Sequence, residues 1–182
     1  MTAAVRPGPL TAGIAALVAT LSLTGCGGGA AAGGGQAARS DYPVVQGYQL
    51  QAPVDEVERA YLAYWGAWLA ASRTPGAAGT QLQGHAAEPA LGIDLSTLAS
   101  DVHQGVVLRG SVDHHVLGMA VVGETRKIAD CVGLDQWRLY DARTGLQSPG
   151  QLTAKRRQLA FITLRKLDGV WKVTDSQQAM AC

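Results

Sequence analysis

The chain has 182 residues and a formal net charge of +1, with 16% charged side chains and 23 glycines. This composition excludes a disordered acidic chain, a basic nucleic-acid-binding protein and a multidomain enzyme. The near-neutral charge does not point to any particular partner. There are three cysteines, an odd number, so they cannot all be paired within the chain.

Residues 1–25 have the features of an export signal. Arg6 is their only charged residue, and the uncharged, mainly apolar residues 10–23 follow it. This stretch has the length of the apolar region of a signal peptide and is too short to span a bilayer. The sequence therefore predicts that the protein is exported from the cytoplasm.

The end of this stretch, Leu23-Thr24-Gly25-Cys26, resembles the lipobox of bacterial lipoproteins. The resemblance implies that residues 1–25 are removed as a signal peptide and that Cys26 becomes the first residue and carries a diacylglycerol thioether. The lipid would anchor the protein to the outer face of the cytoplasmic membrane. The alternatives are a free buried cysteine in an ordinary secreted or membrane protein, and a short uncleaved membrane anchor.

Residues 26–40 are expected to form a tether. After Cys26 they are almost entirely glycine and alanine, so they cannot bury useful apolar area. A flexible chain of this length spans on the order of 20 Å. A domain that follows it would stay close to the membrane surface.

Residues 41–182 are expected to fold as one domain, with 13 basic and 14 acidic side chains. Pro53 and the acids after it predict a helix start, and Ser72 and Thr74 lie at its expected end. Apolar and aromatic residues recur along it at helical spacing: Val54, Val57, Tyr61, Tyr64 or Trp65, and Trp68. This stripe is interpreted mainly as core, with the alternative that its tyrosines line a pocket.

The rest of the domain is predicted to contain short helices followed by strands. One or two helices are expected within residues 77–101, ending near Asp101 and before Gly105. Strands are expected at residues 106–112, 116–131, 136–142, 157–167 and 170–173, with Gly118 and Gly123 as bends or bulges in the long second strand. Asp168-Gly169 predicts a hairpin turn between the last two. Helices followed by antiparallel strands indicate an α+β fold.

This order of elements resembles the nuclear-transport-factor-2-like (cystatin-like) cone, and more narrowly the small actinobacterial lipoproteins that contain it. The resemblance covers residues 54–182 and depends on the aromatic first helix, the terminal cysteine and several short segments. These segments are Asp130-Cys131, Asp141-Ala142-Arg143-Thr144-Gly145 and Asp168-Gly169-Val170-Trp171-Lys172-Val173. It implies N-terminal helices packed on a strongly bent antiparallel sheet.

Cys131 and Cys182 remain if Cys26 carries lipid, and an exported domain lies in a compartment where disulfides form. A bond between them would attach the chain end to the sheet. The alternative is a thiol nucleophile with His114 or His115 as its base. We expect the disulfide.

Enzymes with the resembled fold use the cavity between the cone and the first helix. Here the residues that could line such a cavity are Tyr61, Tyr64, Trp68, His115 and Asp130. Asp113, His114 and His115 are expected on a turn, where both histidines are more simply explained as solvated. No catalytic residue is assigned, and the sequence has no metal-ligand spacing or cofactor motif.

Two classes of function remain open. The first is a non-catalytic binding or envelope-complex module, attached to the membrane, that binds a small apolar molecule or another envelope protein but no nucleic acid. The second is a cofactor-free cavity enzyme of the isomerase, dehydratase or cyclase type. Export and the absence of a catalytic motif favour the first class, partly by analogy with the resembled fold.

Overall fold

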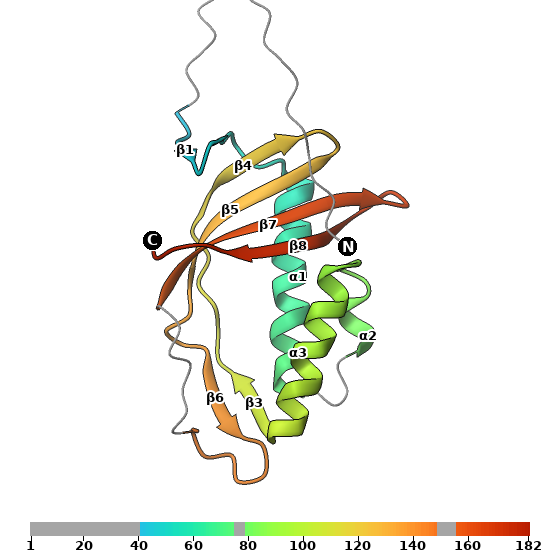
Figure 1. Ribbon diagram of the computed structural model, residues 1–182, viewed down its shortest axis with the longest axis vertical. Helices are drawn as coiled ribbons and strands as arrows, with labels where there is room; N and C mark the ends of the chain where they lie inside the picture. The colour runs from blue at the N-terminus through green and yellow to red at the C-terminus, as the bar shows by residue number, and fades with distance from the viewer. Residues whose placement is uncertain (1–40, 75–78, 149–155) are drawn as a thin grey trace, which may run out of the picture. The chain divides into compact units, whose positions relative to one another are not determined.

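The structure is a computed structural model that describes residues 41–74, 79–148 and 156–182, the coloured parts of Figure 1. These residues belong to one compact unit, Ala38–Cys182. The expected signal peptide, Cys26 and tether lie outside the described residues.

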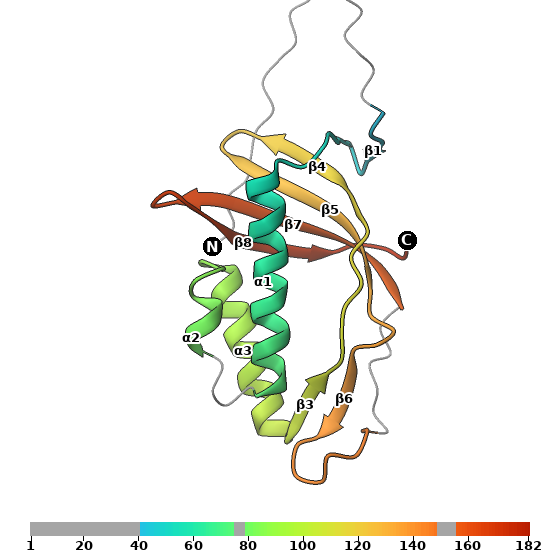
Figure 2. The same ribbon diagram turned by 180° about the vertical axis from the view of Figure 1, so that it is seen from behind.

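Three helices, labelled in Figures 1 and 2, occur in the described part of the chain. They are α1 (Asp55–Arg73), α2 (Gly79–Leu82) and α3 (Ala90–Gln104). Helix α1 agrees with the sequence prediction, and three acids in its first turn lie at the positive end of the helix dipole. Helix α3 ends three residues later than Asp101, because Gly105 adopts the left-handed conformation that closes it.

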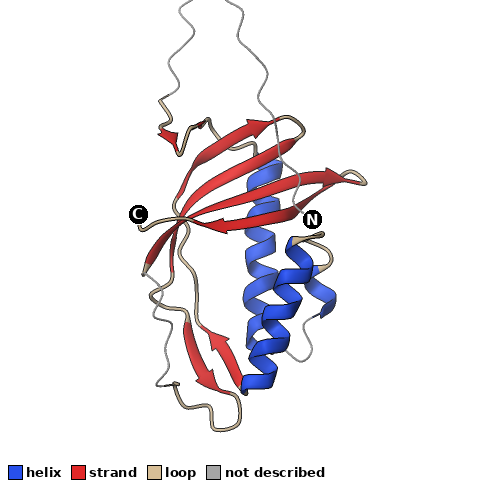
Figure 3. Ribbon diagram, in the orientation of Figure 1, coloured by secondary structure: helices blue, strands red, loops and turns tan. Residues whose placement is uncertain are grey.

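Eight strands occur among the described residues, and all their pairings are antiparallel. They are β1 (Val44–Val45), β2 (Tyr48–Gln49), β3 (Val106–Arg109), β4 (Val116–Val122), β5 (Thr125–Gly133), β6 (Arg138–Asp141), β7 (Arg157–Leu167) and β8 (Val170–Gln178). The main sheet has the order β4-β5-β7-β8, while β3 pairs with β6 and β1 with β2. The sheets do not close into a barrel. The predicted α+β class is confirmed (Figure 3).

The prediction of one long strand over residues 116–131 is wrong. The chain turns back at Gly123, so that Val122 pairs with Thr125 and β4 and β5 form a hairpin. Gly123 has a φ of +56°, which a glycine adopts without steric cost in a tight turn. Gly118 is a bend as predicted, because the pairing register shifts between Val116 and Gly118.

The main sheet buries both of its faces. Its inner face packs against α1 through residues such as Ile128, Ile162 and Val173. Its outer face carries a smaller apolar cluster that includes Ala129 and Phe161. The β1–β2 segment, which the sequence analysis did not predict, contributes Tyr42, Val45, Tyr48 and Leu50 to that outer cluster.

The β3–β6 pair extends the fold beyond the main sheet, beside the C-terminal half of α1 (Figures 1 and 2). Gly110 directly follows β3, with a φ of +113°, and a Cβ atom there would lie 1.8 Å from the backbone oxygen of Gln136. Only glycine allows the chain to approach so closely at this point. The space enclosed by α1, α3, β3 and β6 holds the cavity described below.

Candidate functional site

The aromatic stripe of α1 points into the interior, as the sequence predicts. Tyr61 is fully buried, Tyr64 and Trp65 are buried, and Trp68 lies one turn further along the helix at 9% exposure. Positions 61, 64 and 68 share one helical face, because residues three and four apart lie on the same side. This face meets β5 at one end and the β3–β6 pair at the other.

Asp130, on β5, is the centre of a buried polar cluster. The Tyr61 hydroxyl donates a hydrogen bond to Asp130 Oδ2 over 2.5 Å, and His114 Nδ1 lies 2.7 Å from the same oxygen. The Asp130 side chain is fully buried, whereas that of His114 is 18% exposed. The imidazole is also in contact with two aromatic rings, those of Tyr61 and Trp65.

This cluster has the connectivity of an oriented acid–base group. Asp130 fixes one ring nitrogen of His114, which leaves Nε2 on a partly exposed ring. Burial, followed by the charge of Asp130, raises the pKa of the Tyr61 phenol, so Tyr61 acts here as a neutral hydrogen-bond donor. Within the described part of the chain, Asp130 Oδ1 is buried without a hydrogen-bond partner.

A second carboxylate–tyrosine pair lies between α1 and α3. The Tyr64 hydroxyl donates to Asp94 Oδ2 over 3.0 Å. Burial raises the pKa of Asp94 to about 6, and the hydrogen bond from Tyr64 opposes this shift only in part. Burial and the nearby Asp94 also raise the pKa of Tyr64. The pair links the two long helices through a carboxyl group that is mostly ionised at pH 7 and becomes protonated as the pH falls through about 6.

A cavity of about 420 Å³ lies beside this helix pair, between α1, α3, β3 and β6. This volume lies within the range of small-molecule sites. Its walls are mainly apolar, with a few polar side chains at one side. The lining residues are Trp68, Thr97, Asp101, Gln104, Val106, Leu108, Trp137, Leu139 and Ser148.

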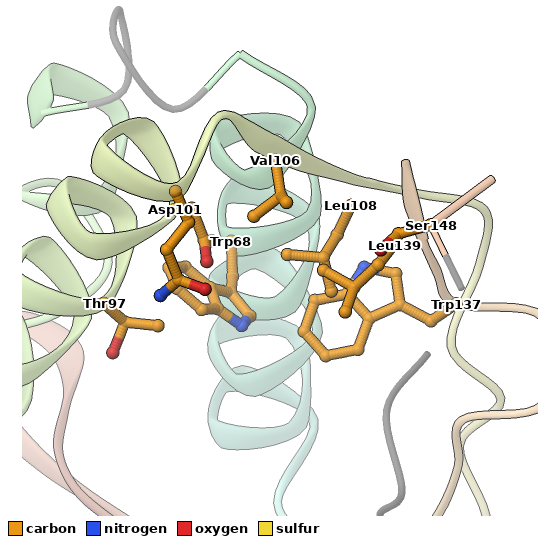
Figure 4. Close-up of a pocket in the computed structure, with 9 residues that line it drawn as sticks. Trp68, Thr97, Asp101, Val106, Leu108, Trp137, Leu139 and Ser148 are labelled. Atoms are coloured by element: carbon orange, nitrogen blue, oxygen red, sulfur yellow. The ribbon is translucent and has the colours of Figure 1, made fainter. Parts of the chain in front are cut away.

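The side chains of the cavity are arranged around two indole rings. Figure 4 shows Val106 and Leu108 of β3 pointing into the same space as the rings of Trp68 and Trp137. Trp68 and Leu108 are buried and form the floor, while Thr97 and Gln104 are exposed and form the rim. The site can therefore enclose an apolar or aromatic body and leave one end of it near solvent.

Two buried polar atoms of the cavity residues have no hydrogen-bond partner among the described residues: Asp101 Oδ2 and Trp137 Nε1. Burial raises the pKa of the Asp101 carboxyl. Such atoms cost free energy unless a ligand or water pairs with them. These two atoms are buried in the walls of a cavity whose lining is mainly apolar.

The five predicted pocket residues have different locations. Trp68 lines the cavity, while Tyr61, Tyr64 and Asp130 are buried beside it in the core and are not among its lining residues. His115 is not among the described lining residues, and its exposure agrees with the interpretation that this histidine is solvated. Alternate residues of a strand share a face, and Val116 pairs with Asp130, so His114 points inward and His115 outward.

The expectation that His114 is solvated is wrong for the same reason. The sequence analysis also missed Asp101, Leu108 and Trp137 as cavity residues. The only sequence signal for Asp101 was its position in the last turn of a helix, and Trp137 lay in a predicted strand. Their convergence depends on the pairing of β3 with β6, which local patterns do not specify.

The structure contains the disulfide between Cys131 and Cys182, with a Cα–Cα distance of 5.9 Å. Cys131 pairs with Leu159 across β5 and β7, and the backbone of Leu159 also bonds to Ala179 and Met180. The bond therefore attaches the chain end to the sheet, and Cys131 is not a free thiol. The predicted lipid site, Cys26, lies outside the described residues.

No group of three or more potential metal ligands occurs in residues 41–74, 79–148 and 156–182. None of the helices in these ranges is both long and apolar enough to cross a bilayer.

No protein family and no curated protein matches the sequence. Among solved structures, the chain is similar to the intermembrane space region of the chloroplast protein ARC6, with a TM-score of 0.52 and 14% sequence identity. The match covers 71% of this chain and 99% of that one. At this identity the likeness concerns the fold alone, and it supports the class defined above, an α+β domain with antiparallel sheets.

Proposed function

We propose that the protein is a membrane-anchored extracytoplasmic lipoprotein whose α+β domain binds a small, largely apolar molecule without chemical change. The cavity between α1, α3, β3 and β6 carries this proposal, because it combines a ligand-sized volume, two indole rings and unpartnered polar atoms. The lipobox-like segment ending at Cys26 and the Cys131–Cys182 disulfide support export, since such bonds persist in oxidising compartments.

Cavity filling tests the binding role. Val106 points into the cavity and is half-buried, so Val106→Trp would occupy the space. The neutral dye N-phenyl-1-naphthylamine should become fluorescent with the wild-type protein, and Val106→Trp should remove the signal. Val102→Trp, at a position 50% exposed on α3 and outside the lining, is the control and should bind as wild type. Equal dye binding by Val106→Trp would overturn the role of the cavity.

Anchoring is tested by lipid incorporation. Cells grown with an alkyne analogue of palmitate should label the wild-type protein at Cys26. Cys26→Ala should abolish the label, whereas Cys182→Ala should retain it, because Cys182 takes part in the disulfide. A Cys26→Ala protein that still carries label would contradict the anchoring proposal.

We further propose that the fold is the nuclear-transport-factor-2-like cone, and that the protein is one of the small actinobacterial lipoproteins with this domain. The support is the succession of a long aromatic helix, a second helix and an antiparallel sheet that packs against them. In this interpretation the cavity described here is the counterpart of the one that such domains enclose beside their first helix. Another envelope protein remains an alternative ligand.

One observation favours the cavity enzyme as a second candidate: the hydrogen-bonded Tyr61–Asp130–His114 cluster. A catalytic His114 needs an accessible Nε2 atom, which diethyl pyrocarbonate modifies. Catalysis predicts that His114 reacts about as fast as the exposed His103 and His115, while a structural role predicts that it is protected. Mass mapping of the modified histidines distinguishes a catalytic role of His114 from a structural one.

A further inference from the structure

The charges of the side chains that line the cavity, as well as its volume, indicate the class of ligand. This step rests on the proposed function, that is, on the cavity being a ligand site. Among the nine lining residues that the structure describes, Asp101 is the only one with an ionisable side chain, and none is basic. No ion pair involves Asp101 within the described part of the chain.

Asp101 lies in an unfavourable place for a carboxylate. It belongs to the last turn of α3, where the helix dipole is negative and favours cations over anions. Its Oδ2 atom is buried and has no partner among the described residues. Burial also raises the pKa of the carboxyl, which is the effect expected of an anion without a compensating charge. A cation in the cavity would supply the compensating charge that the carboxyl lacks at this end of the helix.

The two indole rings strengthen the same preference. Trp68 and Trp137 present their rings to the cavity (Figure 4), and indole is the aromatic side chain that attracts cations best. A primary ammonium group could pair with the carboxylate of Asp101 while its apolar body lies against Val106 and Leu108. An anionic ligand would instead meet a carboxylate, and no basic residue occurs in the described part of the lining to offset it.

We propose that the cavity binds an amphipathic amine, in which an ammonium group pairs with Asp101 and an aromatic or alkyl body packs between Trp68 and Trp137.

Three probes of one size test this proposal on the full chain: 4-phenylbutylamine, the neutral 4-phenylbutanol and the anionic 4-phenylbutyrate. Binding is measured by isothermal titration calorimetry with the protein kept in solution by an amphipol. The amine should bind about tenfold more tightly than the alcohol, and the butyrate should bind least. Asp101→Asn should remove the preference for the amine and still bind the alcohol. Glu124→Gln, which removes the same charge at an exposed position outside the cavity, should behave as wild type.

The possible failures are distinguishable. If the wild-type protein binds the amine and the alcohol equally, or if Asp101→Asn keeps the preference for the amine, the ligand class is wrong while the cavity remains a binding site. If none of the probes binds, both this inference and the proposed binding function are overturned. Trp137→Phe provides a second check and should weaken the amine more than the alcohol, because phenylalanine attracts a cation less than tryptophan does.

Discussion

Two buried hydrogen bonds, each from a tyrosine hydroxyl to a carboxylate, join α1 to its neighbours. The bond from Tyr61 to Asp130 connects α1 to β5, and the bond from Tyr64 to Asp94 connects α1 to α3. A buried carboxylate oxygen that loses its donor costs more free energy than the hydrogen bond itself contributes. These two tyrosine hydroxyls are therefore expected to affect stability beyond the packing of their rings.

Tyr61→Phe tests this for the first pair. The ring remains in place while Asp130 loses a donor, so the free energy of unfolding should fall by about 1–3 kcal/mol. Urea denaturation measures the change. Tyr140→Phe, on the half-buried strand β6, is the control and should shift stability by no more than about 0.5 kcal/mol. Equal effects of the two substitutions would contradict the role of the Tyr61 hydroxyl.

Asp94 should make stability depend on pH. Its folded pKa of about 6 lies above the unfolded value, so the folded state binds more protons between these values, and stability falls as pH rises through this window. Asparagine does not ionise, so Asp94→Asn does not lose stability as the pH rises through this window. Its amide oxygen can still accept the hydrogen bond from Tyr64. We expect the variant to be more stable than wild type by about 1 kcal/mol at pH 7.5, after allowance for partial solvent screening.

Thermal unfolding of wild type and Asp94→Asn at pH 4 and pH 7.5 measures this dependence. The advantage of the variant should disappear at pH 4, where Asp94 is mostly protonated in the folded protein. A constant difference across this range would show that the carboxyl does not titrate as stated.

At the scale of elements, the β3–β6 pair depends on one glycine. A Cβ atom at Gly110 would collide with the backbone oxygen of Gln136, and the φ of this residue is unfavourable for other residues. Gly110→Ala should therefore lower the free energy of unfolding by about 2–4 kcal/mol. It should also weaken dye binding, because the two strands form one wall of the cavity.

Gly66→Ala is the matched control. This glycine lies on the exposed side of α1, and a Cβ there meets nothing within 4 Å. Alanine has a higher helix propensity, so the variant should be more stable by roughly 0.5–1 kcal/mol. If Gly110→Ala were as stable as Gly66→Ala, the close approach of the two strands would not exist as described.

Local signals predicted the elements well where a single residue type determines the backbone. Asp168-Gly169 predicted the β7–β8 turn, and Pro53 with its following acids predicted the start of α1. Gly123 was expected to be a bend or bulge within one strand, but it forms a turn between two strands. Glycine in a strand pattern is compatible with either structure. The expectation that His114 is solvated was wrong because its direction follows from the register of Val116 with Asp130, which is a long-range pairing.

The candidate site was harder to predict than the fold. Trp68 was found because helical periodicity placed it on the buried face of α1. Asp101 lies on α3, Leu108 on β3 and Trp137 directly before β6, and they meet only because β3 folds against β6. No local sequence pattern predicts that these residues come together. The sequence therefore suggested a pocket near α1 but not the residues that line it.

At the scale of the whole molecule, the disulfide joins residues 51 positions apart in the chain. Closing a loop of this length restricts the unfolded chain and is worth about 4 kcal/mol in the chain-entropy estimate. Cys182→Ser should lower the urea midpoint accordingly, and addition of a reductant should then have no further effect. A reductant that leaves the wild-type midpoint unchanged would contradict this contribution.

We propose that a disulfide-bonded domain with a ligand cavity is held at a membrane through Cys26. Native mass spectrometry of the protein extracted from membranes tests this proposal in one experiment. We expect a chain that starts at Cys26 and carries a diacylglycerol group, has no free thiol, and retains a small molecule that Val106→Trp releases. A chain that keeps residues 1–25 without lipid, or that has free thiols at Cys131 and Cys182, would contradict it.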